Sequence, residues 1–145
     1  RIIEAGTFAA NGRGAQNTII IQVTNKEIRD EIAKRNADIM GSNTDPFYGA
    51  PVILIVLGKK DWPTHVYDGS LVMGNLMLAA HDLGIGSCWI HRAKEEFETD
   101  FGKELLKSLG IEDEYEGIGH CILGYPEGDY PETPERKENR VFTIQ

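Results

Sequence analysis

The stretch that decides the fold runs from Asp68 to Arg92, DGSLVMGNLMLAAHDLGIGSCWIHR. Its first half predicts a helix that is almost wholly apolar, since only Gly74 and Asn75 interrupt the apolar side chains between Leu71 and Ala80. These side chains fall on every side of a 3.6-residue helix instead of along one stripe. The second half predicts a glycine stop followed by a short strand.

A helix of this kind needs cover on its whole surface. A chain of 145 residues makes one domain with a modest interior, so apolar residues on the far side of the helix indicate a second surface. The interface of an obligate homodimer has this composition. We therefore expect a homodimer, and the alternative is a central helix that is wrapped by its own chain.

The overall composition is that of an ordinary globular protein, with 41% hydrophobic and 26% charged residues. The formal charge of −8, without any long basic run, argues against nucleic acid as a partner. No apolar stretch reaches the length of a membrane span, and no leader pattern is present. We expect a cytoplasmic protein without membrane association.

The two cysteines, Cys88 and Cys121, are too few for a disulfide scaffold. Both lie in apolar strand-like segments, so we expect free thiols that pack as small buried side chains in a reducing compartment. Cys88, His91, His120 and Cys121 are metal-ligand types, but no metal site is expected from them. Residues three apart or adjacent on a strand point to opposite faces and make no chelating pair.

Hydrophobic patterning predicts further elements along the chain. In chain order these are the end of a helix at Arg1–Ala5 stopped by Gly6, a strand at Ile19–Val23, a helix started by a capping box at Thr24–Glu27, a central strand at Val52–Leu57, a strand at Ser87–Ile90, a helix from about Glu95 to Leu109, and a strand at Ile118–Leu123. Pattern rules alone would build this alternation as a parallel three-layer sheet.

The last residues, 125–145, form a charged tail with three prolines. Such a tail cannot pack on itself, so we expect it to lie over the body or a partner subunit and to add an edge strand at Val141–Ile144. The opening residues resemble the last turns of a longer helix, and we expect residues upstream of Arg1 in the intact protein.

Two segments suit ligand binding better than scaffolding. In Ala10–Gln16, glycines permit close approach to a ligand, and Asn, Arg and Gln supply hydrogen-bond donors; a simple connecting loop is the alternative. Arg136 and Lys137 suit an anionic phosphate, and the alternative is a surface pair. No hydrolase elbow, phosphate-binding loop or self-sufficient acid/base pair is present. A cofactor with its own reactivity reconciles these features, and a flavin fits.

With these residues in view, the chain resembles the FMN-dependent nitroreductase family in its short single-domain form. The match is most specific over Asp68–Arg92, and further support comes from AGTFAANGRGAQ, YGAPVILIV, GHCILGYPEG and PERK, in this order. The resemblance implies an α+β three-layer fold over residues 1–145, with a mixed central sheet and an entwined homodimer. This expectation replaces the parallel sheet.

The resemblance also implies a flavin site at the dimer interface. The loop residues would touch the flavin ring and ribityl chain, the strand-end residues would lie beside the ring, and the basic pair would meet the phosphate. The amides of His91 and Arg92 would lie near N5 and O4, and no catalytic side chain is implied. The implied cofactor-binding residues are Asn11, Gly12, Arg13 and Gln16, then Trp89, Ile90, His91 and Arg92, then Arg136 and Lys137.

The implied activity is a ping-pong oxidoreduction, in which NADH or NADPH reduces FMN and a small-molecule acceptor such as a nitroaromatic or quinone takes the electrons. Two departures from the family stand out: an Arg-rich N-terminal segment is missing, and Ala10 replaces a proline. The chain is therefore expected to be N-terminally truncated. The alternative function is a flavin-binding or dimeric interaction module without turnover, and a specialised dehalogenase or dehydrogenase is less expected because the loop Gly41–Pro51 is short.

Overall fold

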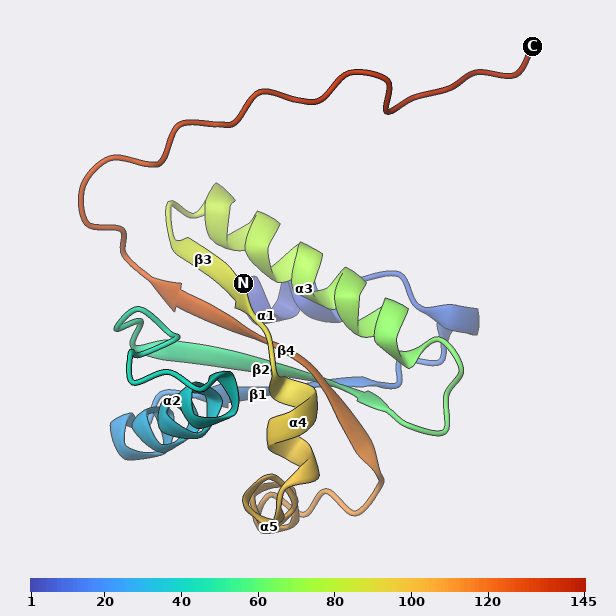
Figure 1. Ribbon diagram of the computed structural model, residues 1–145. Helices are drawn as coiled ribbons and strands as arrows, with labels where there is room; N and C mark the ends of the chain where they lie inside the picture. Colours follow the sequence, from blue (N-terminus) through green and yellow to red (C-terminus); the bar gives the residue numbers. More distant parts are fainter.

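The computed structural model describes all 145 residues, and Figure 1 shows one sheet between two helical layers. The strands are β1 (Thr18–Val23), β2 (Val52–Lys59), β3 (Gly86–Ile90) and β4 (Tyr115–Gly124). On one face lie α1 (Ile2–Thr7) and α3 (His65–Asp82), and on the other lie α2 (Lys26–Met40), α4 (Ala93–Glu98) and α5 (Asp100–Ser108). A short turn of 3₁₀-helix, η1, covers Gly12–Gly14. The expected α+β three-layer fold is confirmed.

The sheet has the strand order β1-β2-β4-β3, and each neighbouring pair is antiparallel. These four strands are therefore neither parallel nor mixed, which corrects both expectations of strand direction. Only α3 joins two strands of the same direction, β2 and β3, and β4 lies between them. The connections through α2 and through α4–α5 return to the end of the sheet where they began. Alternation of strands and helices does not distinguish these two kinds of connection.

Strand β2 is one of the two interior strands of the sheet, as its continuous apolar run predicts. Alternate side chains enter two separate cores. Ile53, Ile55 and Leu57 pack with the α2, α4 and α5 layer, whereas Leu54 and Val56 pack with α3. Each core buries one apolar face of the sheet, and this burial stabilises the fold by about 25 cal/mol for each Å² of apolar area removed from water.

Helix α3 keeps one apolar stripe exposed in the single chain. Its residues Tyr67, Leu71 and Leu78 are 71%, 50% and 71% exposed, and Gly74 lies between them in sequence at helical spacing. The opposite face, with Met73 and Leu76, is fully buried against the sheet. The helix is therefore not wrapped by its own chain, which was the alternative to a dimer.

Several element boundaries differ from the sequence expectation. Helix α1 continues through Gly6, which is buried against Leu76 and does not adopt the left-handed backbone of a helix stop. Helix α2 is capped by Asn25 and not by Thr24, because the Asn25 side chain accepts a hydrogen bond from the N–H of Ile28 at 3.0 Å. The expected helix over Glu95–Leu109 is broken at Thr99, which caps α5.

Two further expectations on burial and pairing are wrong for the single chain. Cys121 is buried, but Cys88 is exposed on β3; neither forms a disulfide. The expected edge strand at Val141–Ile144 does not form, and residues 125–145 leave the body as an extended tail (Figure 1). A strand forms only beside an exposed sheet edge with which it can pair. The tail runs away from the sheet, so no such edge lies next to Val141–Ile144.

The loop between α2 and β2 is fixed by a buried arginine. The Arg29 guanidinium donates to the Ala50 carbonyl at 2.9 Å and to Asp45 Oδ2 at 2.6 Å. The Asp45 carboxylate also accepts from the N–H groups of Phe47 and Gly49, both at 2.9 Å. Desolvation raises the pKa of Asp45, but these hydrogen bonds outweigh it and hold the pKa below the ordinary value of 3.8.

This network predicts how acid affects stability. Because the folded pKa of Asp45 is depressed, its contribution is present above pH 3.8 and is lost as the pH falls through the folded pKa. We expect Asp45→Asn to unfold at a lower urea concentration than the parent chain at pH 7. The difference between the two unfolding midpoints should be smaller at pH 3. A difference that is equal at both pH values would contradict this role of the carboxylate.

Candidate functional site

The loop that follows α1 is fastened to the start of α3. The backbone N–H of Gly12 donates to Oδ1 of Asp68 at 2.9 Å, and the Thr64 hydroxyl donates to Oδ2 of the same carboxylate, also at 2.9 Å. Asp68 is only 3% exposed. A Cβ at Gly12 would lie 2.3 Å from Thr64 Oγ1, so only glycine permits this approach. The loop is therefore a fixed part of the α3 layer.

The same loop holds two non-glycine residues in left-handed backbone conformations. These are Arg13 and Gln16, with φ of 56° and 52°. The Asn11 side chain stabilises the turn between them, because its Oδ1 accepts from the Gln16 N–H at 2.9 Å and its Nδ2 donates to the Ala9 carbonyl at 3.2 Å. Such conformations cost free energy and gather at binding sites. The Arg13 and Gln16 side chains are exposed and have no protein partner.

A cavity of about 230 Å³ lies beside this loop and is lined partly by Asn11, Gln16 and Thr18. The Thr18 hydroxyl is buried with no hydrogen-bond partner, and so is the indole N–H of Trp62 near Gly12. Buried polar groups are normally paired, so two orphaned groups beside one loop indicate a place where a ligand or water completes the hydrogen bonding.

The second segment is the junction between β3 and α4. The pairing of β3 with β4 ends at Ile90 and His120, so the next two residues, His91 and Arg92, lie beyond the ladder. The N–H groups of His91 and Arg92 donate to no protein acceptor. Arg92 has a left-handed φ of 75° and forms the N-cap of α4. The junction thus offers two adjacent free amide donors.

Asn36 of α2 fixes this junction from the protein interior. Its Nδ2 donates to the His91 carbonyl at 2.9 Å, and its Oδ1 accepts from Arg92 Nε at 2.9 Å. Asn36 has no exposed surface. Sequence reasoning missed this residue, although a polar side chain on the same face as Ile32, Ala33 and Ala37 was a signal for it.

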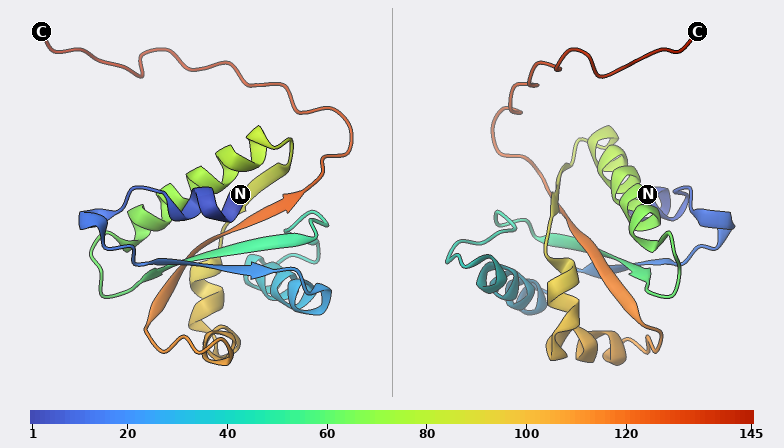
Figure 2. Two further views of the ribbon diagram at one scale, coloured as in Figure 1. Left: turned by 180° about the vertical axis from the view of Figure 1, so that it is seen from behind. Right: turned by 45° about the vertical axis from the view of Figure 1, so that its right-hand side comes forward.

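The structure does not bring the two segments together within one chain. The loop Ala10–Gln16 leads into edge strand β1, whereas Trp89–Arg92 ends β3 at the opposite edge (Figure 2). Three strand spacings separate the two edges, about 14 Å. Arg136 and Lys137 belong to the exposed tail of residues 125–145, which leaves the body of the molecule (Figure 2).

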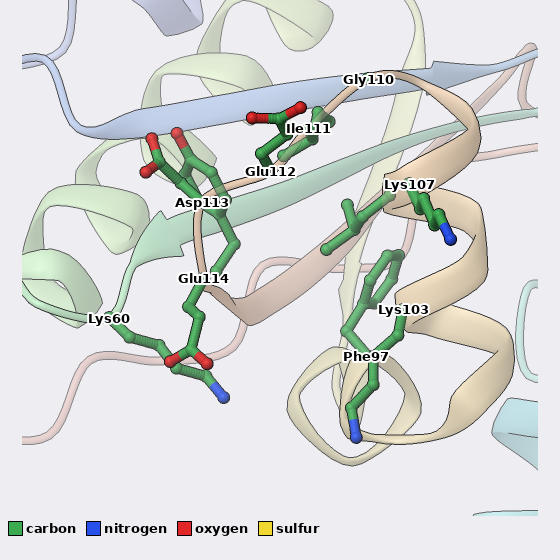
Figure 3. A pocket seen from close by; sticks show the side chains of 11 residues that line it. Lys60, Phe97, Lys103, Lys107, Gly110, Ile111, Glu112, Asp113 and Glu114 are labelled. Carbon is green, nitrogen blue, oxygen red and sulfur yellow. The ribbon is translucent and has the colours of Figure 1, made fainter.

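A larger hollow lies elsewhere, between α5 and the start of β4 (Figure 3). It has a volume of about 630 Å³ and a mixed rim that carries three lysines and three carboxylates. The rim charges are Lys60, Lys103 and Lys107 with Glu112, Asp113 and Glu114. No side chain that lines it is buried with an unpaired polar atom. Nothing in this hollow points to a ligand, so the loop and the strand end remain the candidate site.

Two kinds of feature are absent from the chain. No three residues among its histidines, cysteines, aspartates and glutamates cluster closely enough to hold a metal ion. None of its helices combines the length and apolar character of a membrane span.

Comparison with known proteins gives a consistent picture. Residues 35–125 match the Nitroreductase family. A nitroreductase with bound FMN from Bacteroides fragilis aligns with 99% of this chain and 84% of its own, at 25% identity and a TM-score of 0.88. An FMN-bound nitroreductase from Desulfitobacterium hafniense aligns with 99% of this chain and 84% of its own, at 23% identity and a TM-score of 0.83.

A third similar structure is an iodotyrosine deiodinase bound to FMN and 3-iodo-L-tyrosine. It aligns with 99% of this chain and 85% of its own, at 20% identity and a TM-score of 0.74. At this identity the likeness extends to the fold alone. No curated protein sequence matches the chain.

Proposed function

The chain belongs to the nitroreductase family, and from this premise we propose that it is an FMN-dependent oxidoreductase that takes electrons from NADH or NADPH. The acceptor class we propose is nitroaromatics, quinones or similar small molecules, reduced in a ping-pong cycle. The observation that supports this most directly is the pair of free amide donors at His91 and Arg92, together with a family in which similar structures hold FMN.

The residues of the chain fit a flavin mononucleotide. The rim of a flavin ring presents hydrogen-bond acceptors, and the N–H groups of His91 and Arg92 are unpaired donors on a rigid junction. Asn11, Arg13 and Gln16 present donors of the kind that suit ribityl hydroxyls and ring oxygens. The orphaned Thr18 hydroxyl and Trp62 N–H add two more polar groups beside the loop.

The proposed site is completed by a second subunit. Because the loop and the β3 end lie at opposite sheet edges, one ligand that touches both needs the loop of one subunit and the strand end of the other. The exposed stripe of α3 offers an apolar surface on which two copies would pack. The tail would then lie against the partner and bring Arg136 and Lys137 to the phosphate.

The bound flavin would supply the redox chemistry, accepting a hydride from the nicotinamide and returning two electrons to the acceptor. The chain contributes position and electrostatics. The amides of His91 and Arg92 would donate hydrogen bonds to one edge of the ring, where a carbonyl oxygen gains negative charge on reduction, and Trp89 and Ile90 would place the strand beside the ring. No side-chain nucleophile is needed.

The test is a visible absorption spectrum of the purified chain, recorded without oxygen before and after addition of FMN, then NADH or NADPH, then a quinone. We expect bound flavin to bleach with the nicotinamide and to recover with the quinone. A yellow protein that the nicotinamide does not bleach would support the alternative, a flavin-binding module without turnover. No binding at excess FMN would overturn the proposal.

The proposed dimer predicts that charge on the α3 stripe separates the subunits. A Leu71→Lys/Leu78→Lys variant places cations where two apolar surfaces would meet, and loss of a central contact costs about 2 kcal/mol per copy. Over two copies the dimer should dissociate about a thousandfold more readily. Sedimentation velocity measures this, and Leu109→Lys is the control because Leu109 is 53% exposed on the other helical layer. Identical sedimentation of all three proteins would contradict this interface.

The proposed phosphate contact predicts weaker FMN binding when the tail cations are removed. Arg136→Ala/Lys137→Ala should raise the dissociation constant about tenfold, since a charge-assisted hydrogen bond to phosphate is lost. Lys103→Ala/Lys107→Ala changes the charge by the same amount on α5 and should not change the constant. Flavin fluorescence titrations measure both, and unchanged affinity in the tail variant would remove this pair from the site.

A further inference from the structure

The peptide that joins His91 to Arg92 is held from one side only. Its carbonyl oxygen accepts a hydrogen bond from Asn36 Nδ2 at 2.9 Å, and its N–H, which belongs to Arg92, has no protein acceptor. In a planar trans peptide the C=O and N–H point in opposite directions. The hydrogen bond from the interior therefore aims the Arg92 N–H away from α2.

A second contact keeps this peptide from rotating. The left-handed φ of 75° at Arg92 is unfavourable for a residue with a side chain. The Nε of Arg92 donates to Asn36 Oδ1 at 2.9 Å, so one fully buried amide holds the residue both by its side chain and by the preceding carbonyl. The conformation persists because Asn36 compensates its cost.

A hydrogen bond at the carbonyl also strengthens the opposite N–H as a donor, because linked hydrogen bonds polarise one another. We propose that Asn36 is a positioning residue, which aims and polarises the Arg92 N–H toward O4 of the flavin, a carbonyl oxygen that gains negative charge on reduction, and so favours the reduced state. This inference rests on the proposed FMN function. Asn36 itself touches no cofactor in this scheme and acts through the His91–Arg92 peptide.

The test compares Asn36→Leu with the parent chain, both loaded with FMN, by anaerobic dye-equilibration measurement of the flavin reduction potential. We expect the bound flavin to become about tenfold harder to reduce, which is about 30 mV for a two-electron couple. Asn36→Ala is the second variant, because alanine suits the interior of α2 if leucine disturbs folding. It should shift the potential in the same direction.

The matched control is Asn75→Leu in α3. The Asn75 Nδ2 donates to the Ala5 carbonyl at 2.9 Å. This change therefore also removes a hydrogen bond from an asparagine side chain to a carbonyl far away in sequence, but at a place away from the β3–α4 junction. We expect the control to lose stability without a change in potential. If both Asn36 variants bind FMN with the parent potential, the inference is wrong while the proposed function stands. If the parent chain binds no FMN, the proposed function fails and this inference fails with it.

Discussion

Replacing His120 by leucine is expected to destabilise the fold by about 3–5 kcal/mol, because it leaves a carboxylate buried without its partner. His120 and Glu96 have no exposed surface, and His120 Nε2 lies 3.0 Å from Glu96 Oε2. Apart from this contact, the polar side-chain atoms of the pair have no partner, and none of them meets the geometry of a hydrogen bond. The pair lies inside the apolar core beneath α4, with the His120 ring 5.2 Å from that of Phe47.

The decisive variant for this pair is the double replacement. Glu96→Met/His120→Leu removes both polar groups and keeps similar volumes, so it should be more stable than either single variant and close to the parent. Urea unfolding at pH 7 and at one fixed protein concentration measures all four proteins, which excludes effects of subunit association. If the double variant loses the sum of the two single losses, the two side chains are not coupled.

The local parts of this fold could be predicted from the sequence. The β-branched run at Ile19–Val23 and the apolar run at Val52–Leu57 gave two strands close to their observed bounds, because patterning acts within a few residues. The break at Thr99 was missed, since an apolar spacing continues across it. The signal was present in Thr99 and Asp100, which together start a helix in the usual way.

Strand direction could not be predicted, since it depends on where a connection ends and not on its pattern. The chain places β4 between β2 and β3, a contact between residues far apart in sequence. The same limit applies to the site. Family resemblance located His91 and Arg92, but their fixation by Asn36 depends on packing between α2 and the β3–α4 junction. These residues lie 55 and 56 positions from Asn36, a separation that no local pattern records.

The sequence also could not predict which apolar side chains stay exposed in the single chain. An apolar segment at Ser87–Ile90 predicted a buried Cys88, but β3 is an edge strand and the thiol is exposed in the single chain. The apolar surface of α3 was likewise predicted to be covered, and in one chain it is covered on one side only. The exposed stripe of α3 is the surface that the proposed dimer would cover.

The second large effect is expected at Gly117 of β4, the strand that packs against the start of α4. A bulge shifts the register of β4 against β2 here, since Val56 pairs with Gly119 and Leu57 with Gly117. At this bend a Cβ on Gly117 would lie 2.2 Å from the carbonyl oxygen of Ala93, the first residue of α4. The contact is with backbone, so no side-chain rotation relieves it.

Gly117→Ala should therefore force α4 away from the sheet, at a cost near the upper end of overpacking, about 3 kcal/mol. Because α4 begins directly after Arg92, the displaced junction should also bind FMN more weakly. Gly124→Ala is the control in the same strand, since its Cβ would meet Pro51 at an ordinary 3.4 Å. Urea unfolding and FMN titration of both variants measure the two effects. A Gly117→Ala chain as stable as the control would mean that α4 can move outward without loss of packing, and the junction could then not be as rigid as its contacts indicate.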